Sequence, residues 1–264
     1  IINSSDINLP TVEWAEDLDQ SHFAELLSVV LMKITDAVVF ITGANRGLGL
    51  VLAKEAVKCG AKKVYAGMRN TQDFNEQGII PIQMDVTDSD SIQKAVAECD
   101  DVTILINNAG IARLNQSPVE ADIVKSTRQI LETNLYGVIN TTQQFSTILE
   151  NKQQGYIVNI LSDVSWQPST FLASYAISKA AAWSFTNSTR QWLAQKNVHV
   201  MGVHVGFIDT YLTQSLDIPK ISPKTVAEQV FDGIEQNAFE VLVGESTQQL
   251  KQNLTAVVPS YIYL

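Results

Sequence analysis

Cysteine and histidine are scarce in this chain of 264 residues, with two and three copies respectively. Cys59 and Cys99 lie far apart and outside any Cys-x-x-Cys or Cys/His spacing. A disulfide framework or a zinc site needs such clusters, and no carboxylate pair or His/Asp cluster replaces them. We therefore expect no metal site, and we expect both cysteines to pack as small hydrophobic residues. His199 and His204 alternate along a predicted strand, so we expect them to pack rather than to bind a ligand.

Basic charge is also in short supply. The chain has 18 Lys and Arg residues against 28 Asp and Glu residues, which gives a formal net charge of -10. Binding to nucleic acid or to an anionic membrane surface depends on clustered cations that neutralise phosphates. We therefore expect neither as a partner.

Long hydrophobic runs are missing. The short apolar stretch from Leu26 to Met32 follows a segment rich in acidic residues, so it lacks the positive flank of a signal peptide, and it is too short to span a bilayer. The expectation is no membrane association and, by default, a cytoplasmic location.

The composition predicts one globular domain. Hydrophobic residues make up 45% of the chain and charged residues 17%, and no repeat, low-complexity tract or Pro/Gly-rich linker divides it. We assign residues 32–264 to a single domain. Residues 1–31 form an N-terminal extension of uncertain role, for which a regulatory or dimerising function stays open.

From Asp36 onward, short runs rich in β-branched residues alternate with longer helical patterns. This alternation is typical of βαβ units around a parallel sheet, so we predict a doubly wound Rossmann-type α/β fold with helices on both faces of the sheet. The seven predicted strands are Ala37–Thr42, Lys63–Ala66, Ile79–Met84, Val102–Ile106, Tyr156–Leu161, Val198–Val205 and Val241–Val243. The predicted helices are Leu48–Lys58, Ser91–Ala97, Val119–Leu149, Leu172–Gln195 and Pro223–Gln236.

A glycine-rich turn joins the first predicted strand to the first helix. Glycines in such a turn let the backbone approach a pyrophosphate, and the helix N-terminus that follows attracts anions. The spacing is GxxxGxG and no Walker GK[ST] follows, which disfavours an ATPase. The turn predicts a dinucleotide site that involves Gly43, Asn45, Arg46, Gly47, Leu48 and Gly49.

Charge indicates which dinucleotide this is. An NAD site places an acidic residue at the end of the second strand, but this chain has Arg69 and Asn70 there. Arg46 lies in the glycine turn, and the chain has only five arginines. Because guanidinium groups suit phosphate geometry, the two arginines favour NADP(H) over NAD(H) through its 2′-phosphate.

Proton chemistry is suggested by Tyr175 and Lys179, which lie four residues apart in a predicted helix and so share one face. A neighbouring cation lowers the pKa of a phenol, which would make Tyr175 a usable acid and base. Ser162 ends the fifth predicted strand, at the edge where open α/β sheets bind ligands. Asp163 beside it could contact the site or could serve as hydrogen-bonded structure.

These motifs together resemble the short-chain dehydrogenase/reductase family over essentially all of residues 35–245. The resemblance is to its short, single-domain, NADP(H)-preferring branch and to carbonyl reductases. It rests on Thr42-Gly43-Ala44-Asn45-Arg46-Gly47-Leu48-Gly49, Asp85-Val86, Asn107-Asn108-Ala109-Gly110, Asn134, Ser162 and Tyr175-Ala176-Ile177-Ser178-Lys179.

The resemblance implies a role for each matching residue. Tyr175 would protonate the carbonyl oxygen, Lys179 would lower the tyrosine pKa and bind the nicotinamide ribose, and Ser162 would polarise the carbonyl. Asn134 would connect Lys179 to solvent through a helix irregularity and a bound water. Further cofactor contacts would come from Asp85, Val86, Asn108, Ala109 and Gly110, and from Gly206, Ile208 and Thr210 in a segment where Val205 stands in place of the family's usual proline.

The predicted activity is NADP(H)-dependent hydride transfer between a carbonyl and an alcohol, with hydrophobic aldehydes or ketones as small-molecule substrates. Candidates for the apolar lining of the substrate pocket are Trp166, Phe171, Phe207, Tyr211 and Leu212. By resemblance, a homodimer or homotetramer would form through the two long helices. Two alternatives stay open: an NADP-binding sensor or scaffold without turnover, and an epimerase or dehydratase of the extended branch, which the glycine spacing and the short chain after Gly244 disfavour.

Overall fold

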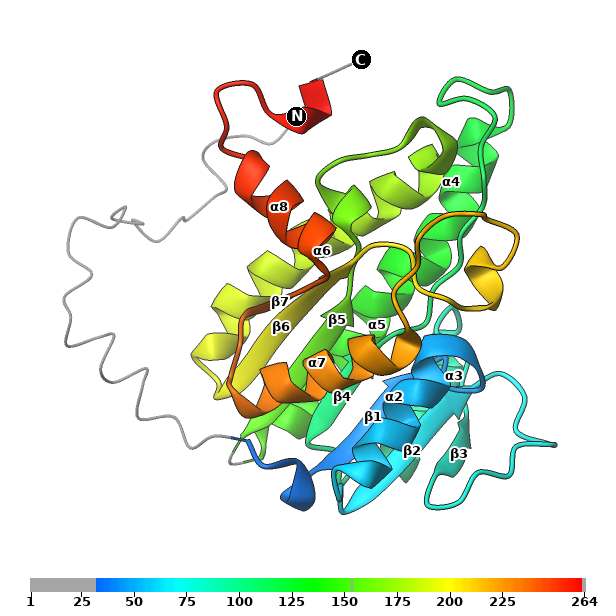
Figure 1. Cartoon of the computed structure of the whole chain (residues 1–264). Coiled ribbons are helices and arrows are strands. Elements are labelled where there is room, and N and C mark those ends of the chain that lie inside the picture. Colours follow the sequence, from blue (N-terminus) through cyan, green and yellow to red (C-terminus); the bar gives the residue numbers. More distant parts are fainter. Residues whose placement is uncertain (1–31, 153, 263–264) are drawn as a thin grey trace, which may run out of the picture. The chain divides into compact units, whose positions relative to one another are not determined.

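The computed structural model describes residues 32–152 and 154–262, so the predicted extension at residues 1–31 lies outside the described residues. Seven parallel strands form one sheet, as predicted, and their order is β3-β2-β1-β4-β5-β6-β7 (Figure 1). They are β1 (Val38–Thr42), β2 (Lys63–Met68), β3 (Ile80–Gln83), β4 (Ile104–Asn107), β5 (Gly155–Ile160), β6 (Val198–Val205) and β7 (Glu240–Val243).

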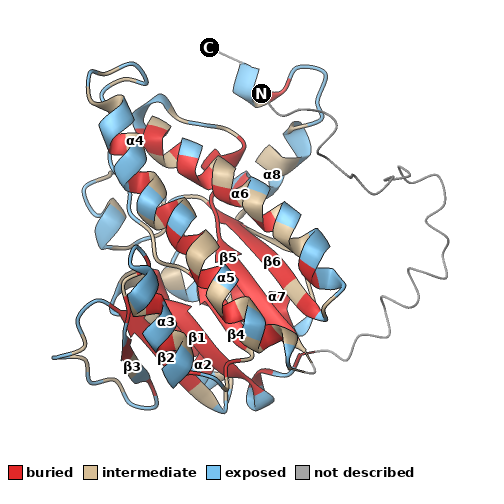
Figure 2. Ribbon diagram, turned by 180° about the vertical axis from the view of Figure 1, so that it is seen from behind, coloured by how far each residue is buried: buried red, intermediate tan, exposed pale blue. Residues whose placement is uncertain are grey.

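Helices cover both faces of the sheet. On one face lie α2 (Gly47–Lys58) and α7 (Pro223–Glu235), and on the other lie α3 (Ser89–Glu98), α5 (Gly137–Glu150) and α6 (Ala173–Ala194) (Figures 1 and 2). The strands β1, β4 and β5 are buried along their whole length because both faces are covered. Their continuous apolar runs follow from this two-sided burial.

Two apolar cores result, one on each side of the sheet. Ile41 and Ile106 pack with Leu52 of α2 and Val230 of α7 in the first core. Phe40 and Leu105 point to the opposite face, where they meet Phe145 of α5. Neighbouring strand residues alternate between the cores, and this alternation sets the register of the whole sheet.

The long helix predicted from Val119 to Leu149 begins later than expected. Residues 116–122 form turns, because Glu120 accepts from the backbone N–H of Gln116 at 2.6 Å and Ser117 accepts from that of Val119 at 3.1 Å. Such side-chain bonds compete with helix formation. The helix starts as α4 (Ile123–Leu131), widens into a π-helical turn η2 (Glu132–Tyr136) and continues as α5.

Elements after β7 were not predicted. Helix α8 (Glu245–Asn253) and the short turn η6 (Ser260–Ile262) follow the last strand. The sequence of α8 is polar and buries only Thr247, so it carries little of the apolar periodicity by which helices are found.

Strand order places a ligand site at one edge of the sheet. After β1 the chain moves outward to β2 and β3, then returns to β4 on the other side of β1 and moves outward again. The helices reached from β1 and from β4, α2 and α5, lie on opposite faces of the sheet, and open α/β sheets bind ligands at such a change of direction.

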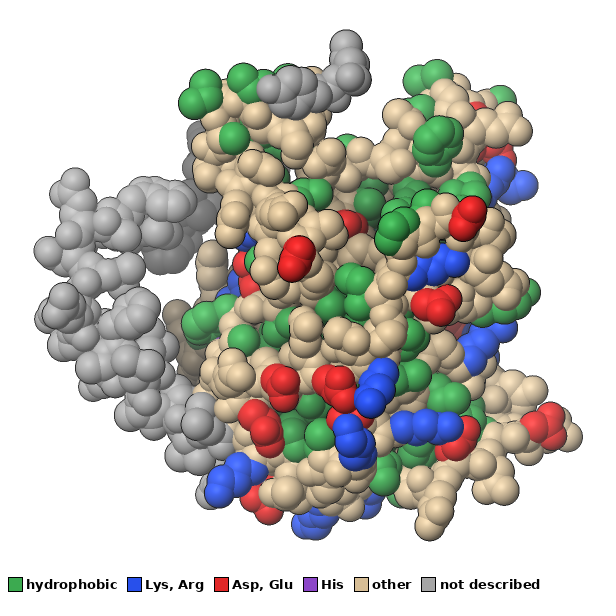
Figure 3. Space-filling model, viewed as in Figure 1, with side chains coloured by type: hydrophobic (Ala, Val, Ile, Leu, Met, Phe, Trp, Pro, Cys, Tyr) green, Lys and Arg blue, Asp and Glu red, His purple; other side chains and the backbone are tan. Residues whose placement is uncertain are grey.

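The described surface carries mixed charge. Over α2 and α7, lysines and acidic residues lie next to one another, with Lys58 and Lys224 at 3.6 Å and 3.7 Å from Glu228 (Figure 3). Within residues 32–152 and 154–262, no helix has the length and apolar character needed to cross a membrane. The same residues contain no group of three or more His, Cys, Asp and Glu side chains arranged to hold a metal ion.

Candidate active site

A cleft of about 410 Å³ opens at the carboxyl ends of the strands. Its walls come from the segments that follow β1, β2, β3, β4, β5 and β6. Most of the predicted site residues line it: Gly43, Asn45, Arg46, Gly47, Leu48, Gly49, Arg69, Asp85, Val86, Asn108, Ala109, Gly110, Ser162, Tyr175, Lys179, Gly206, Ile208 and Thr210.

The glycine turn after β1 needs its glycines. Gly43 has a φ of +66°, and a Cβ on it would lie 2.9 Å from the Cα of Ala109. A Cβ on Gly49 would lie 2.4 Å from the carbonyl oxygen of Gly43. Side chains at these positions would separate the turn from the loop after β4, so the glycines keep both loops close to the cleft.

The first turn of α2 faces the cleft without a side-chain cap. Arg46 precedes the helix and makes no capping hydrogen bond, whereas Asp88 caps α3 and Ser222 caps α7. The uncapped amides carry partial positive charge and suit a pyrophosphate. The site therefore fits a dinucleotide at the turn where the sequence predicted one.

Asn108 fastens the two loops of the switch point to each other. Its Nδ2 donates to the carbonyl oxygens of Thr42 and Gly43 at 2.9 Å and 3.2 Å. The Oγ1 of Thr42 accepts in return from the backbone N–H groups of Asn108 and Ala109. These contacts position the cleft walls, and they give Asn108 a structural role beside the predicted cofactor contact.

Both arginines that suggested NADP(H) line the cleft. Arg46 stacks on the ring of Tyr211, with its guanidinium carbon 4.9 Å from the ring centre, and Arg69 is exposed at the end of β2. Asn70 does not line the cleft, contrary to its prediction as a cofactor contact. Its Oδ1 accepts from the backbone N–H of Gln72 at 3.0 Å, so this side chain closes a local turn instead.

Ser162, Tyr175 and Lys179 meet in the same cleft. Ser162 follows β5 and donates from Oγ to Asp163 at 3.0 Å, while Tyr175 and Lys179 come from the first turns of α6. The Nζ of Lys179 donates to the carbonyl oxygen of Ile160 at 2.7 Å and lies 5.7 Å from the centre of the Tyr175 ring. The fold thus gathers the three side chains that the sequence placed far apart.

Lys179, which we expected to lower the pKa of Tyr175, is not among the groups that shift that pKa in this structure. Burial raises the pKa of the Tyr175 phenol and the neighbouring Asp163 raises it further, while the hydrogen bond that Tyr175 shares with Ser162 lowers it. Burial also lowers the pKa of Lys179 to about 8. At neutral pH Tyr175 is therefore a protonated acid, the form that gives a proton to a carbonyl oxygen.

Asn134 lies in the π-helical turn η2, behind the cleft wall. Its Oδ1 accepts from the backbone N–H of Ile111 at 2.8 Å, and its Nδ2 donates to the carbonyl of Ile111 at 2.9 Å and to Ser178 at 3.0 Å. The π-helical geometry directs the Asn134 side chain toward the loop after β4 and toward α6. Asn134 thereby ties the wall of the cleft to the helix that carries Tyr175 and Lys179.

The segment after β6 folds over the cleft. Ile208 and Ile221 pair as an isolated bridge, and the N–H of Ile221 donates to the carbonyl of Phe207 at 2.8 Å. Val205, which replaces the usual proline, ends β6 and pairs with Val243 of β7. Phe207, Tyr211 and Leu212, which the sequence offered as pocket residues, line the cleft.

Trp166 and Phe171 do not line that cleft, so their prediction as pocket residues is wrong. Trp166 is buried, stacked on the His204 ring with 3.8 Å between ring centres, because η3 (Asp163–Ser165) turns it back against β6. Phe171 belongs to η4 (Thr170–Leu172), and its side chain is exposed to solvent.

The sequence reasoning missed cleft residues in the loop after β4, where Ile111, Arg113 and Leu114 add to the lining. Asn115 next to them accepts from the N–H of Ser174 at 3.1 Å and donates to Glu120 at 2.8 Å, which fixes the loop on the start of α6. The position of Ile111, Arg113 and Leu114 in the loop after a strand end could have indicated that they line the ligand site.

Residues 37–220 match the family described as short chain dehydrogenase. The chain is also 31% identical over 194 residues to a 3-oxoacyl-[acyl-carrier-protein] reductase of Salmonella typhimurium, covering 70% of this chain and 79% of the relative. The chain belongs to the short-chain dehydrogenase/reductase family. It is therefore an oxidoreductase that acts on CH–OH or carbonyl groups with NAD(P).

Solved structures of this dehydrogenase family share the fold. A short-chain dehydrogenase of Burkholderia cenocepacia J2315, crystallised with NADP, is 35% identical with a TM-score of 0.81, covering 86% of this chain and 95% of that chain. A Burkholderia phymatum enzyme crystallised with NAD is 19% identical with a TM-score of 0.73, covering 84% and 94%, and supports the fold alone.

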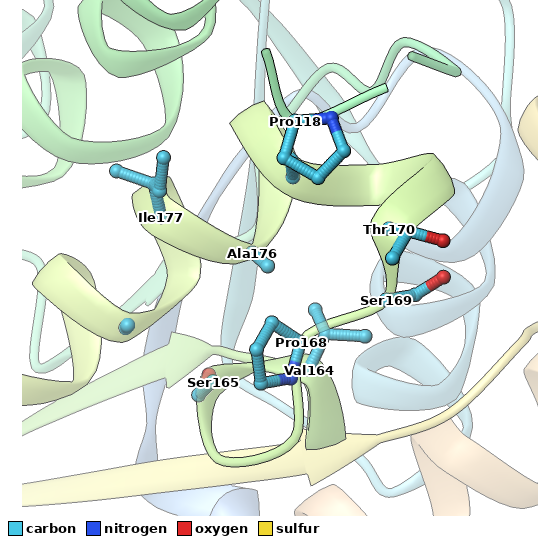
Figure 4. Close-up of a pocket in the computed structure, with 10 residues that line it drawn as sticks. Pro118, Val164, Ser165, Pro168, Ser169, Thr170, Ala176 and Ile177 are labelled. Carbon is cyan, nitrogen blue, oxygen red and sulfur yellow. The ribbon is translucent and has the colours of Figure 1, made fainter. Parts of the chain in front are cut away.

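A second hollow of about 340 Å³ lies on the outer side of this dehydrogenase's α6. Pro118, Pro168, Ala176 and Ile177 surround it, with the hydroxyls of Ser169 and Thr170 at its rim (Figure 4). None of its lining residues is ionisable, so the acid-base chemistry belongs to the cleft and not to this hollow.

Proposed function

We propose that this dehydrogenase is an NADP(H)-dependent carbonyl reductase or alcohol dehydrogenase, with residues 32–264 acting as one domain. The observation that carries the proposal is the convergence of Ser162, Tyr175 and Lys179 in the cleft that the glycine turn opens. A protein that only binds a nucleotide has no use for a buried acid beside a hydroxyl. The convergence therefore favours turnover over a sensor or scaffold.

In this proposal the bound cofactor supplies or accepts a hydride. Tyr175 gives its phenolic proton to the carbonyl oxygen and takes a proton back when an alcohol is oxidised. Ser162 positions the same oxygen, and Lys179, with Asn134 behind it, restores the proton through solvent. The raised pKa of Tyr175 keeps the phenol protonated at neutral pH, which is the form that carbonyl reduction uses.

The preference for NADP(H) rests on charge at the cleft wall. The end of β2 offers Met68 and Arg69 and no carboxylate, and Arg46 lines the same cleft. A 2′-phosphate would meet one or both guanidinium groups. The crystallisation of the 35% identical Burkholderia cenocepacia relative with NADP supports this choice.

Hydrophobic aldehydes or ketones are the proposed substrates. Phe207, Tyr211 and Leu212 line the cleft beside Leu114 and Leu216. An apolar lining with a few directed polar groups is typical of sites for such molecules. For assembly we propose pairing through α4, α5 and α6, along which Val124 and Ile177 leave apolar side chains exposed.

The test is a turnover assay. Purified protein is mixed with NADPH and a panel of aliphatic and aromatic aldehydes and ketones, and nicotinamide absorbance is followed. We expect NADPH oxidation with the apolar members of the panel and little with highly charged ones. NADPH binding without oxidation across the panel would contradict the proposal and favour the sensor.

A further inference from the structure

Asp163 directly follows Ser162 and lines the same cleft as Tyr175. Its Oδ1 accepts the hydrogen bond that Ser162 Oγ donates, at 3.0 Å. A serine hydroxyl has one proton to donate. In this arrangement that proton points at Asp163, so it does not reach the oxygen of a substrate.

The Asp163 carboxyl lies where the fold leaves room for it. A Cβ on Gly206, after β6, would lie 3.1 Å from the Oδ2 of Asp163, so a glycine there makes space for the carboxyl. Ser162 Oγ also accepts from the N–H of Val164 at 3.4 Å. Tyr175 also shares a hydrogen bond with this hydroxyl, but burial keeps its phenol protonated, so Asp163 is the partner whose charge can change.

Asp163 forms no ion pair with any of the described residues. From α6, Lys179 donates to the carbonyl of Ile160 and Tyr175 presents a protonated phenol. From β6, His204 holds the carbonyl of Ser162 through Nδ1 at 3.2 Å, and Glu240 of β7 and Lys251 of α8 pair with each other at 2.8 Å behind it. Burial raises the pKa of Asp163 above its ordinary value.

We propose that Asp163 is a positioning residue that sets the direction in which the Ser162 hydroxyl donates, and thereby whether the cleft holds a carbonyl or an alcohol better. The inference rests on the proposed function, because it concerns the oxygen that is reduced or oxidised there. No atom passes between Asp163 and the substrate.

The two charge states of Asp163 give opposite hydrogen-bond patterns. An ionised carboxylate can only accept hydrogen bonds, so the Ser162 hydroxyl donates to it. Ser162 Oγ is then left as an acceptor, which suits the O–H of an alcohol. A protonated carboxyl can donate to Ser162 Oγ, which frees the serine proton for a carbonyl oxygen. Protonated Asp163 therefore favours the ketone, and ionised Asp163 favours the alcohol.

The experiment measures kcat/KM for reduction of an aryl alkyl ketone and KM for the matching secondary alcohol, each as a function of pH. The proteins are wild type, Asp163→Asn, Asp163→Ala and the control Asp232→Asn, which removes an exposed acid on α7. In wild type we expect reduction to fall by roughly ten- to a hundredfold as Asp163 ionises, the value of one hydrogen bond to developing charge. The alcohol KM falls over the same pH range.

Both Asp163 variants should lose this pH-dependent change, since neither side chain titrates, and Asp232→Asn should keep it. A fall in kcat/KM that is caused by titration of Lys179 would remain in all four proteins, which distinguishes it from the effect of Asp163. If Asp163→Asn and Asp163→Ala fold, as thermal unfolding shows, and keep the full wild-type pH profile, the inference is overturned. If wild type reduces no ketone in the panel, the proposed function fails instead.

Discussion

Arg46 and Arg69 reach the cleft from two different turns, one after β1 and one after β2. Neither guanidinium forms an ion pair with another described residue. Both guanidinium groups can therefore bind a phosphate, and Arg46 also stacks on the ring of Tyr211. At the scale of the residue, cofactor choice depends on these two cations.

Replacing either arginine by alanine should raise KM for NADPH by roughly tenfold, since a charge-assisted bond to phosphate is lost. KM for NADH, which has no 2′-phosphate, should change little. Steady-state kinetics with both cofactors measures this, with Arg128→Ala, an exposed arginine of α4, as the control. Equal efficiency of wild type with both cofactors, or unchanged KM in both variants, would contradict the preference.

For single residues, the sequence predicted which side chains lie in the cleft better than it predicted their burial and pKa. Tyr175, Lys179 and Ser162 were found because helical spacing and a strand end place them in one cleft. The raised pKa of Tyr175 was missed because it comes mainly from burial, which no spacing in the sequence reveals. Trp166 was misplaced for a related reason, since the turn η3 decides on which side of the chain it packs.

At the scale of elements, a polar cluster around the buried His204 connects the last strands and α8 to the catalytic loop. The His204 ring of β6 donates from Nδ1 to the carbonyl of Ser162 and stacks on Trp166. Its Nε2 lies 3.8 Å from Glu240 of β7, which pairs with Lys251 of α8. The cluster holds the backbone of Ser162 through His204, which the sequence indicated only as a packing residue.

His204 predicts a dependence of stability on pH. Burial lowers its pKa from 6.5 to about 4, so the unfolded chain takes up a proton below about pH 6.5 that the folded chain refuses until about pH 4. The free energy of unfolding should therefore fall between those values, by about 2 kcal/mol at pH 4.5. Urea unfolding at pH 7 and pH 4.5 measures the fall.

The matched variant is His204→Phe, which keeps a ring against Trp166 and removes the titrating group. We expect its stability to fall less than that of wild type over this pH range, by about the same 2 kcal/mol. His199 and Asp163 remain in both proteins, so their effects cancel. An equal fall in both proteins would show that His204 is not responsible.

The elements themselves were largely predictable. All seven strands were found, and the central ones stand out because two-sided burial demands continuous apolar runs, as in Phe40-Ile41 of β1 and Leu105-Ile106 of β4. The start of α4 was missed because Ser117 and Glu120 form local hydrogen bonds that hydrophobic periodicity does not report. Helix α8 was missed because it buries so little.

At the scale of the molecule, strand order explains why one cleft holds both the cofactor turn and the acid. The cleft opens where the strand order reverses between β1 and β4, and Asn108 and Asn134 brace its walls. β5, β6 and α6 then bring Ser162, Gly206 and Tyr175 to the same edge. Cofactor binding and proton transfer are therefore separable functions of one site.

The most direct test of the account is single-turnover reduction by Tyr175→Phe together with its affinity for NADPH. The variant removes only the phenolic oxygen. We predict that NADPH binding, followed by nicotinamide fluorescence, stays near wild type while the rate of ketone reduction falls by roughly a hundredfold or more, as expected when a general acid is lost. A variant that reduces the ketone at the wild-type rate would contradict the central claim that Tyr175 supplies the proton.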